Sequence, residues 1–319
     1  MRSLFLSLLT LVAAPAMAQP EGGLYDQDEL GAMLYAHRDS LELIPHVTFR
    51  YHVLRHDRLN NSVLGRMEMY REVGTGDVRR GRELLSGPVE FFNGIRLNNL
   101  SIGDTLIVPS HFNVDFRAYS PFPRYYPGAE ELDKLFIIHK GVQAWAGYEH
   151  GRLVRWGIVN TGAAGTRTPT GRFNFNWQEL SRISTLSPPG ESWLMRWVFN
   201  FHNERGIHIH QYSMPAGQPA SHGCVRMITA DARWVYDWAD AWQTTAGHGS
   251  RGHPTTQGRI LRQGTTVLVL GENEEPTGMP RRFRHTEAGP ELLTVELPGS
   301  PFDVPPGSPQ QVAFDRARR

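Results

Sequence analysis

Cysteine is almost absent from this sequence, which contains a single one, Cys224. One cysteine cannot form a disulfide within its own chain, so a fold stapled by disulfides is excluded. A solitary thiol is then a link between two chains, a small buried apolar residue or a nucleophile. Its sequence neighbours have to decide among these three roles.

An excess of either charge is also lacking, because 33 Lys and Arg residues face 32 Asp and Glu residues. Balanced charge gives no reason to expect nucleic acid or an anionic membrane as a partner. Long apolar runs are missing as well. Leu4–Ala14 is far shorter than the ~20 residues that a membrane-spanning helix needs, so we expect no transmembrane segment in the mature chain.

That apolar run is typical of a targeting segment. Arg2 supplies the positive start, and Ala16-Met17-Ala18 offers the small residues of a cleavage site. We expect cleavage after Ala18, which makes residues 1–18 a signal peptide, and export to the periplasm or the cell wall. Cys224 is therefore expected to work outside the cytoplasm.

The rest of the chain divides into five regions by composition and periodicity. Residues 19–44 are a polar N-terminal segment, residues 45–112 a small α+β domain, residues 113–132 a linker rich in aromatics and proline, residues 133–271 a mainly β domain, and residues 272–319 a proline-rich tail expected to be disordered. The large domain is expected to follow its cysteine with one helix. Val235, Trp238, Ala239 and Trp242 repeat at helical spacing, with Thr229 as the expected N-cap.

In the small domain, Asn98–Pro109 resembles the closing segment of LysM peptidoglycan-binding modules. The Gly103-Asp104 turn and the strand stop at Pro109 carry this resemblance. The matching opening half is not clear in Tyr51–Arg71. An ordinary domain with a turn is the alternative, and binding of peptidoglycan by residues 45–112 is left open.

Histidines gather around the lone cysteine. Gly206–Tyr212 alternates apolar residues with His208 and His210, which predicts a strand with both imidazoles on one face. A loop then leads to Ser221-His222-Gly223-Cys224, and this could bring an imidazole beside the thiol. A neighbouring imidazole lowers the pKa of a cysteine toward the reactive thiolate. Gly223 leaves room for a carbonyl oxygen near the amides around Cys224, as an oxyanion hole requires.

Zinc is the rival explanation for the same residues. His208, His210, His222 and Cys224 could supply four ligands. Spacing alone does not separate a metal site from a nucleophile with its base.

Ser221-His222-Gly223-Cys224-Val225-Arg226 resembles the signature of the L,D-transpeptidase catalytic domain family. Further segments resemble that family in the same order along the chain: Lys134–Gln143, Gly151–Gly162, Thr168-Pro169-Thr170-Gly171-Arg172-Phe173 and Gly264–Leu270. The resemblance implies a β-sandwich with a helix after the cysteine, no metal and no cofactor. It implies peptide stems of peptidoglycan as the substrate.

Site residues follow from this resemblance. It implies that Cys224 attacks the stem, that an upstream histidine is the base, oriented by a backbone carbonyl, and that His222 and Gly223 shape the pocket beside Ser221. Arg226 is expected to be structural or to bind a substrate carboxylate. Either His208 or His210 fits the family's base; we favour His210, because Gln211 and the proline-rich loop follow it.

The resemblance leaves the second half of the reaction open. A transpeptidase would pass the acyl group to another stem and form a 3–3 crosslink, whereas an L,D-carboxypeptidase or hydrolase would pass it to water. A wall-binding protein without catalysis is the alternative from another class, but it has no use for a reactive thiol. The oligomeric state is not indicated.

Overall fold

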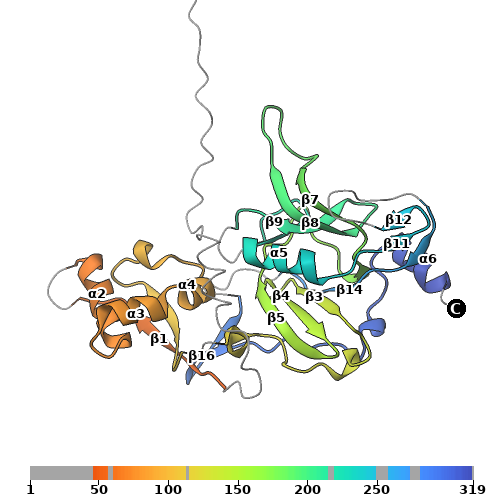
Figure 1. The fold of residues 1–319 in the computed structure, drawn as a ribbon. Helices are drawn as coiled ribbons and strands as arrows, with labels where there is room; N and C mark the ends of the chain where they lie inside the picture. Colours follow the sequence, from red (N-terminus) through yellow and green to blue (C-terminus); the bar gives the residue numbers. More distant parts are fainter. Residues whose placement is uncertain are drawn as a thin grey trace, which may run out of the picture.

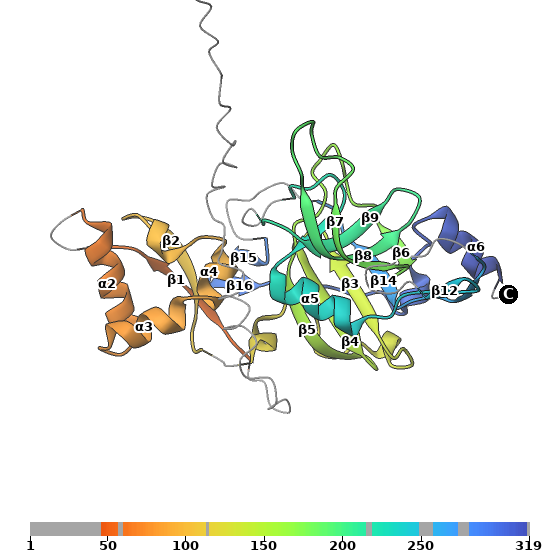
Figure 2. The same ribbon diagram turned by 45° about the horizontal axis from the view of Figure 1, so that its top comes forward.

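The computed structural model describes residues 46–56, 60–112, 115–214, 219–248, 258–273 and 281–317. The expected signal peptide and the segment 19–44 lie outside these residues. Figure 1 shows a small domain, in orange, beside a larger β-sandwich, with strand β16 (Gly289–Leu292) between them. A view turned by 45° keeps this arrangement (Figure 2).

Two strands and the helices between them form the small domain, as expected of an α+β unit. Strand β1 (Phe49–Val53) pairs antiparallel with β2 (Thr105–Pro109), and the predicted Gly103 turn, with φ of 95°, precedes β2. The helices are α2 (Ser62–Val73), α3 (Val78–Leu85), α4 (Pro88–Asn93) and the 3-10 helix η1 (Leu97–Asn99). Asn61 and Asp77 cap α2 and α3, because each carboxamide or carboxylate oxygen accepts two backbone N–H groups at the helix start.

A five-stranded sheet forms the first layer of the sandwich, in the order β5-β4-β3-β14-β6. Its strands are β3 (Leu135–His139), β4 (Ala144–Glu149), β5 (Arg152–Ile158), β6 (Gly171–Asn174) and β14 (Thr266–Leu270). Strand β3 lies in the middle and runs parallel to β14. Its unbroken apolar run is explained by burial on both faces, since Phe136 and Ile138 join one core cluster while Leu135 and Ile137 join another.

A four-stranded sheet forms the second layer, in the order β10-β9-β8-β7. Its strands are β7 (Gln178–Ile183), β8 (Leu194–His202), β9 (Ile207–Gln211) and β10 (Val225–Met227). Ile207, Ile209, Val225 and Met227 turn into the core between the two sheets. The mainly β sandwich expected from the sequence is confirmed, and the residues that alternate with these four point away from the core.

Helix α5 (Thr229–Trp238) follows the cysteine as predicted, with two differences. The N-cap is Ile228, so Thr229 is already inside the helix. The helix also stops at Trp238, because Ala239 adopts an extended conformation with ψ of 156°, and the predicted Trp242 lies beyond its end. Asp231 in its first turn is buried against Arg155, 2.7 Å away.

Residues 113–132 were expected to be a linker, but their described part packs as core. It contains the 3-10 helices η2 (Phe116–Tyr119) and η3 (Pro127–Ala129). The Phe116 ring stacks on Trp156 of β5 at 4.7 Å between centroids. These aromatic side chains fill the space between the sandwich and the small domain.

The expectation of a disordered tail is wrong for residues 281–317. They form the hairpin of β15 (Phe283–Thr286) and β16, the 3-10 helix η4 (Pro301–Asp303) and helix α6 (Pro309–Ala317). Three further short strands, β11 (Gln243–Thr244), β12 (Gly247–His248) and β13 (Ile260–Arg262), form a small sheet before the tail. The tail is ordered because its apolar residues Phe283, Val295 and Val304 are buried in a core that they share with both domains.

Arg282 ties the tail to both domains. Its side chain is 1% exposed and donates to the carbonyl oxygens of Phe92 in the small domain, at 3.0 Å, and of Val142 in the sandwich, at 3.4 Å. A buried guanidinium needs such acceptors to offset its lost hydration. The described parts of both domains therefore share one interface closed by the tail.

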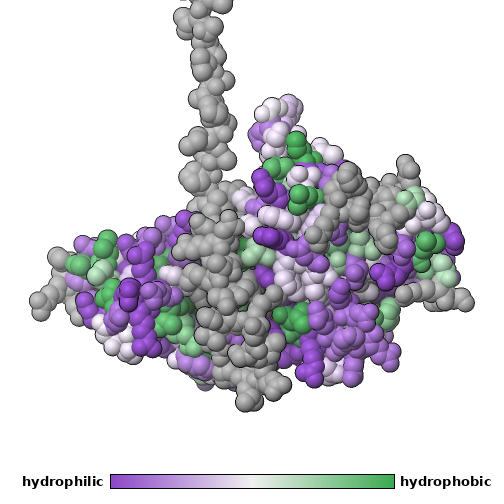
Figure 3. Space-filling view, in the orientation of Figure 1, coloured by the Kyte–Doolittle hydropathy of each residue, from purple (hydrophilic) through white to green (hydrophobic). Residues whose placement is uncertain are grey.

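The hairpin of β7 and β8 projects from the sandwich (Figure 1). Large apolar side chains are exposed along it: Leu180, Ile183, Leu186 and Leu194. Figure 3 shows apolar green patches on this hairpin above a mostly hydrophilic surface. None of the described helices is both long and apolar enough to cross a membrane.

Candidate active site

Strand pairing brings the predicted site residues together. Strands β9 and β10 run parallel, with Val225 beside Ile209 and Arg226 beside His210. Paired residues of neighbouring strands point to the same face, and alternate residues point to opposite faces. His208, His210 and Arg226 therefore lie on the face turned away from the core, and Cys224 joins them from the end of the loop before β10.

A pocket of about 430 Å³ opens on this face. Cys224, His208, His210, His222, Ser221 and Arg226 all line it. The β7–β8 hairpin contributes Arg182, Leu186, Trp193 and Met195, and the turn between β8 and β9 contributes residues 203–206. The sequence had predicted the first group but not the hairpin or the turn.

His208 is buried and turned toward β8. Its Nδ1 lies 3.1 Å from the Asn200 Nδ2, and its ring lies against Trp177. The Asn200 amide is itself oriented, because its Oδ1 accepts from Asn176 at 2.7 Å. Nδ2 only donates, so Nδ1 of His208 accepts and the proton of the neutral ring is on Nε2. Burial lowers the pKa of His208 to about 3, which keeps the ring neutral.

His210 has the opposite tautomer. Its Nδ1 lies 3.0 Å from the carbonyl oxygen of Gln211, which only accepts. Nδ1 therefore donates, and Nε2 carries the free lone pair. Burial lowers the pKa of His210 to about 4, against the Gln211 hydrogen bond, which raises it. A neutral ring with a free Nε2 can accept a proton from a neighbouring acid.

The thiol of Cys224 is partly buried at the pocket wall. Its Sγ lies 4.0 Å from the carbonyl oxygen of Gly206. Burial raises the pKa of the thiol, while the backbone N–H of His208 and the charge of Arg226 lower it. The sequence led us to expect a lowered pKa, and that expectation is wrong for this structure because the loss of water outweighs the two favourable groups. The thiol is therefore neutral at rest and needs a base to become a nucleophile.

The loop before the cysteine is held by Ser221. Its Oγ accepts from the Gly223 N–H at 3.1 Å and donates to the carbonyl oxygen of Cys224. Gly223 has φ of 119°, a conformation that a side chain disfavours, whereas a Cβ there would meet only ordinary contacts. The backbone turn, more than the space for a substrate oxygen, explains the glycine.

His222 and Arg226 lie at the pocket's edge. The exposed His222 ring packs against Trp193 at 5.5 Å between centroids. The Arg226 guanidinium lies 4.8 Å from the centre of the Tyr212 ring and donates to the carbonyl oxygen of Ser213 at 3.4 Å. The aromatic face holds this cation beside the thiol and the imidazole.

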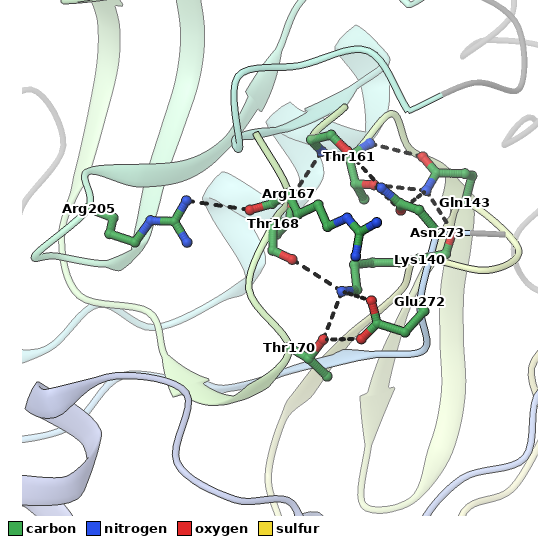
Figure 4. Close-up of polar contacts among 10 residues, drawn as sticks. Lys140, Gln143, Thr161, Arg167, Thr168, Thr170, Arg205, Glu272 and Asn273 are labelled. Carbon is green, nitrogen blue, oxygen red and sulfur yellow. Dashed lines mark hydrogen bonds and ion pairs between the residues drawn. The ribbon is translucent and has the colours of Figure 1, made fainter. Parts of the chain in front are cut away.

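A network of hydrogen bonds around Thr168 and Lys140 holds the cysteine loop. The sequence did not predict this network. Thr168 Oγ1 accepts from the Gly162 N–H at 2.9 Å and donates to the Gly223 carbonyl at 2.8 Å. The Lys140 Nζ, whose side chain is 2% exposed, donates to Thr168 O and to Thr170 Oγ1, and it pairs with Glu272 at 3.2 Å (Figure 4). The family resemblance of the segment beginning at Thr168 does not predict this contact, which the fold shows to hold the Gly223 carbonyl.

The zinc alternative requires several ligands to converge. Across the residues that the structure describes, no three His, Cys, Asp or Glu side chains are grouped so that they could hold a metal ion. The Nδ1 atoms of His208 and His210 are instead engaged by the Asn200 amide of β8 and by the Gln211 carbonyl of β9 itself. These imidazole nitrogens therefore make hydrogen bonds within the protein and do not converge on one point, as zinc ligands would.

Comparison with known proteins identifies the part of the chain that contains this pocket. Residues 133–269 match the family model YkuD, described as the L,D-transpeptidase catalytic domain. No curated protein matches the chain.

Several solved structures are similar in part. An L,D-transpeptidase from Stackebrandtia nassauensis is 22% identical, with 44% of this chain and 57% of that chain covered and a TM-score of 0.32. One from Mycobacterium smegmatis is 15% identical, with 44% and 59% covered and a TM-score of 0.33. One from Xylanimonas cellulosilytica is 22% identical, with 71% and 98% covered and a TM-score of 0.36. The chain thus spans less than two thirds of the first two.

Proposed function

We propose that this protein is a peptidoglycan L,D-transpeptidase that works through an acyl-enzyme on Cys224, because residues 133–269 match the model of the L,D-transpeptidase catalytic domain. The observation that carries the proposal is the tautomer of His210. Its Nδ1 donates to the Gln211 carbonyl, which leaves the Nε2 lone pair available, and His210 lines the same pocket as Cys224. His210 is the base and Cys224 the nucleophile.

The first half of the reaction acylates the enzyme. His210 Nε2 takes the thiol proton, and the sulfur attacks the carbonyl carbon at the L-centre of diaminopimelate in a tetrapeptide stem. The bond to the terminal D-alanine breaks, and its nitrogen leaves with the proton from His210. A thioester on Cys224 remains.

The second half transfers the acyl group. The side-chain amine of another stem loses a proton to His210 and attacks the thioester, which forms the 3–3 crosslink and returns the proton to the sulfur. We expect Arg226 to bind a carboxylate of either stem, because Arg226 lines the same pocket. The site is expected to act outside the cytoplasm, where such stems occur.

Turnover of purified tetrapeptide muropeptides tests the proposal. Mass analysis should show crosslinked dimers together with released D-alanine, and Cys224→Ser should produce neither while remaining folded by circular dichroism, because a hydroxyl lacks the thiolate's nucleophilicity. Tripeptides without dimers would assign the site to an L,D-carboxypeptidase. Crosslinks made by the Cys224→Ser protein would overturn the covalent mechanism.

Trapping the thioester gives a second test. The family resemblance leads us to expect one carbapenem adduct per chain, seen by intact mass and absent in Cys224→Ser. No adduct after long incubation with the wild type would argue against an acylating Cys224.

A further inference from the structure

The chain beyond the matched domain lies along β6, the edge strand of the five-stranded sheet. Residues 305–307 extend beside β6, where the Arg172 N–H donates to Pro305 O at 2.8 Å and the Gly307 N–H donates to Arg172 O at 2.9 Å. The approach is close: a Cβ on Gly307 would come within 2.1 Å of the Phe173 ring. Only glycine fits there, so this part of the tail is docked against the sheet.

Helix α6 is anchored on the same strand. The Arg172 guanidinium makes two hydrogen bonds to the Asp315 carboxylate, at 2.7 and 3.1 Å. Phe314 of this helix packs against the cluster that includes Trp177 and Met195, and both of these line the pocket. The helix therefore supports one pocket wall from behind.

The first turn of α6 contacts Glu204, a residue that lines the pocket. The backbone N–H of Gln310 donates to the Glu204 Oε1 at 2.8 Å, and the other carboxylate oxygen lies 3.2 Å from the His202 Nδ1. A carboxylate is well placed at a helix N-terminus, where backbone N–H groups lack partners within the helix. Glu204 belongs to the turn 203–206 that carries the Gly206 carbonyl, 4.0 Å from the Cys224 Sγ.

We propose that Glu204 is a positioning residue through which α6 sets the turn beside the thiol, so that the working catalytic unit extends to Ala317. The Gly206 carbonyl accepts a hydrogen bond from the thiol and so orients the sulfur before the reaction begins. A turn released from α6 would let this carbonyl and the pocket wall shift. As a statement about turnover, the inference rests on the proposed function.

Two matched pairs of variants test it. Glu204→Ala removes the acceptor, whereas Glu204→Gln keeps an oxygen for the Gln310 N–H. Gln310→Pro removes that N–H at a position in the first helical turn, where proline is tolerated, whereas Gln310→Ala keeps it. We expect Glu204→Ala and Gln310→Pro to lower kcat on muropeptides by about tenfold or more, because a misplacement of about 1 Å can cost up to about 10²-fold.

The two conservative partners should retain most of the wild-type kcat, with KM little changed in all four. Alkylation of Cys224 by iodoacetamide is measured beside turnover, and its rate should change in the same two variants. Wild-type kcat and alkylation rate in Glu204→Ala would overturn the inference, as would losses in all four that follow only the Tm. If the wild type turns over no muropeptide, the proposed function fails, and the alkylation rates still decide the role of Glu204.

Discussion

At the scale of single residues, the two histidines of β9 differ in which hydrogen-bonding partner meets Nδ1. His208 faces an amide donor on β8, and His210 faces a carbonyl acceptor. A proton on Nε2 prevents His208 from accepting one from sulfur, whereas the free Nε2 of His210 permits it. His208 bonds to Asn200 of β8, whereas His210 pairs in register with Arg226 of β10, the strand that follows Cys224.

His210→Ala should therefore slow acylation of Cys224 by about 10²–10⁴-fold, the usual worth of a general base. His208→Ala should slow it much less and mainly lower the Tm, because the lost ring is buried against Trp177. Adduct formation followed by intact mass gives both rates. Alkylation of Cys224 at a fixed pH should also slow in the His210 variant alone, because the thiol loses its base. The reverse pattern would transfer the role of base to His208.

At the scale of structural elements, the segment before β6 and the cysteine loop act as one unit. Thr168 joins them, since its hydroxyl bonds the Gly162 N–H on one side and the Gly223 carbonyl on the other. Thr166 adds a second link, from its hydroxyl to the carbonyl of Ser221 at 2.8 Å. The nucleophile is thus placed by a segment distant in sequence.

Thr168→Val keeps the shape of this side chain but removes both hydrogen bonds. We expect a loss of about 1–3 kcal/mol in the free energy of unfolding, because a buried N–H and a buried carbonyl lose their partner. Turnover should fall with it as the cysteine loop loosens. Urea unfolding and muropeptide turnover measure the two effects. Thr105→Val, at an exposed position of β2, is the control and should change neither.

Local patterns predicted much of this region and failed where distant contacts decide. Residue spacing and residue type predict three features that the structure contains: the strand with His208 and His210, the turn at Gly103 and the helix after Cys224. The end of α5 and the order of the tail depend on packing partners elsewhere in the chain. Likewise, the choice of base between His208 and His210 depends on the orientation of the Asn200 amide, which residue spacing cannot predict.

At the scale of the whole molecule, buried neutral histidines make stability depend on pH. Burial lowers the pKa of His208 to about 3 and those of His210 and His139 to about 4, from an ordinary 6.5. Below about pH 6.5 the unfolded chain binds protons at these sites while the folded chain does not. Their contribution to stability is therefore complete above that pH and is lost as the pH falls toward 4.

Urea unfolding between pH 7.5 and 4.5 should show this loss, at about 1.4 kcal/mol per pH unit for each histidine that titrates only in the unfolded state. Carboxylates add little over most of this range because they titrate lower. An unchanged free energy of unfolding from pH 7.5 to 4.5 would contradict the prediction.

The buried bridge at Arg282 predicts a loss of stability that spans both domains. Arg282→Ala should lower the free energy of unfolding by at least about 1–3 kcal/mol, since two buried carbonyls lose their donor. Arg284→Ala is the matched control on the same hairpin, where an exposed pair with Glu291 should matter little. Chemical unfolding of both variants gives the comparison. Equal stability of the two would show that the bridge does not hold the domains.

The pairing of residues 305–307 with β6 also bears on how this protein can be divided. Strand β6 is the last strand of its sheet, and the tail occupies its outer hydrogen-bonding groups. A fragment ending near residue 270 would leave those groups open, with the Phe173 ring no longer covered by Gly307. Open strand edges recruit other strands, so such a fragment is expected to self-associate and precipitate, whereas the chain through Ala317 carries its own edge protection.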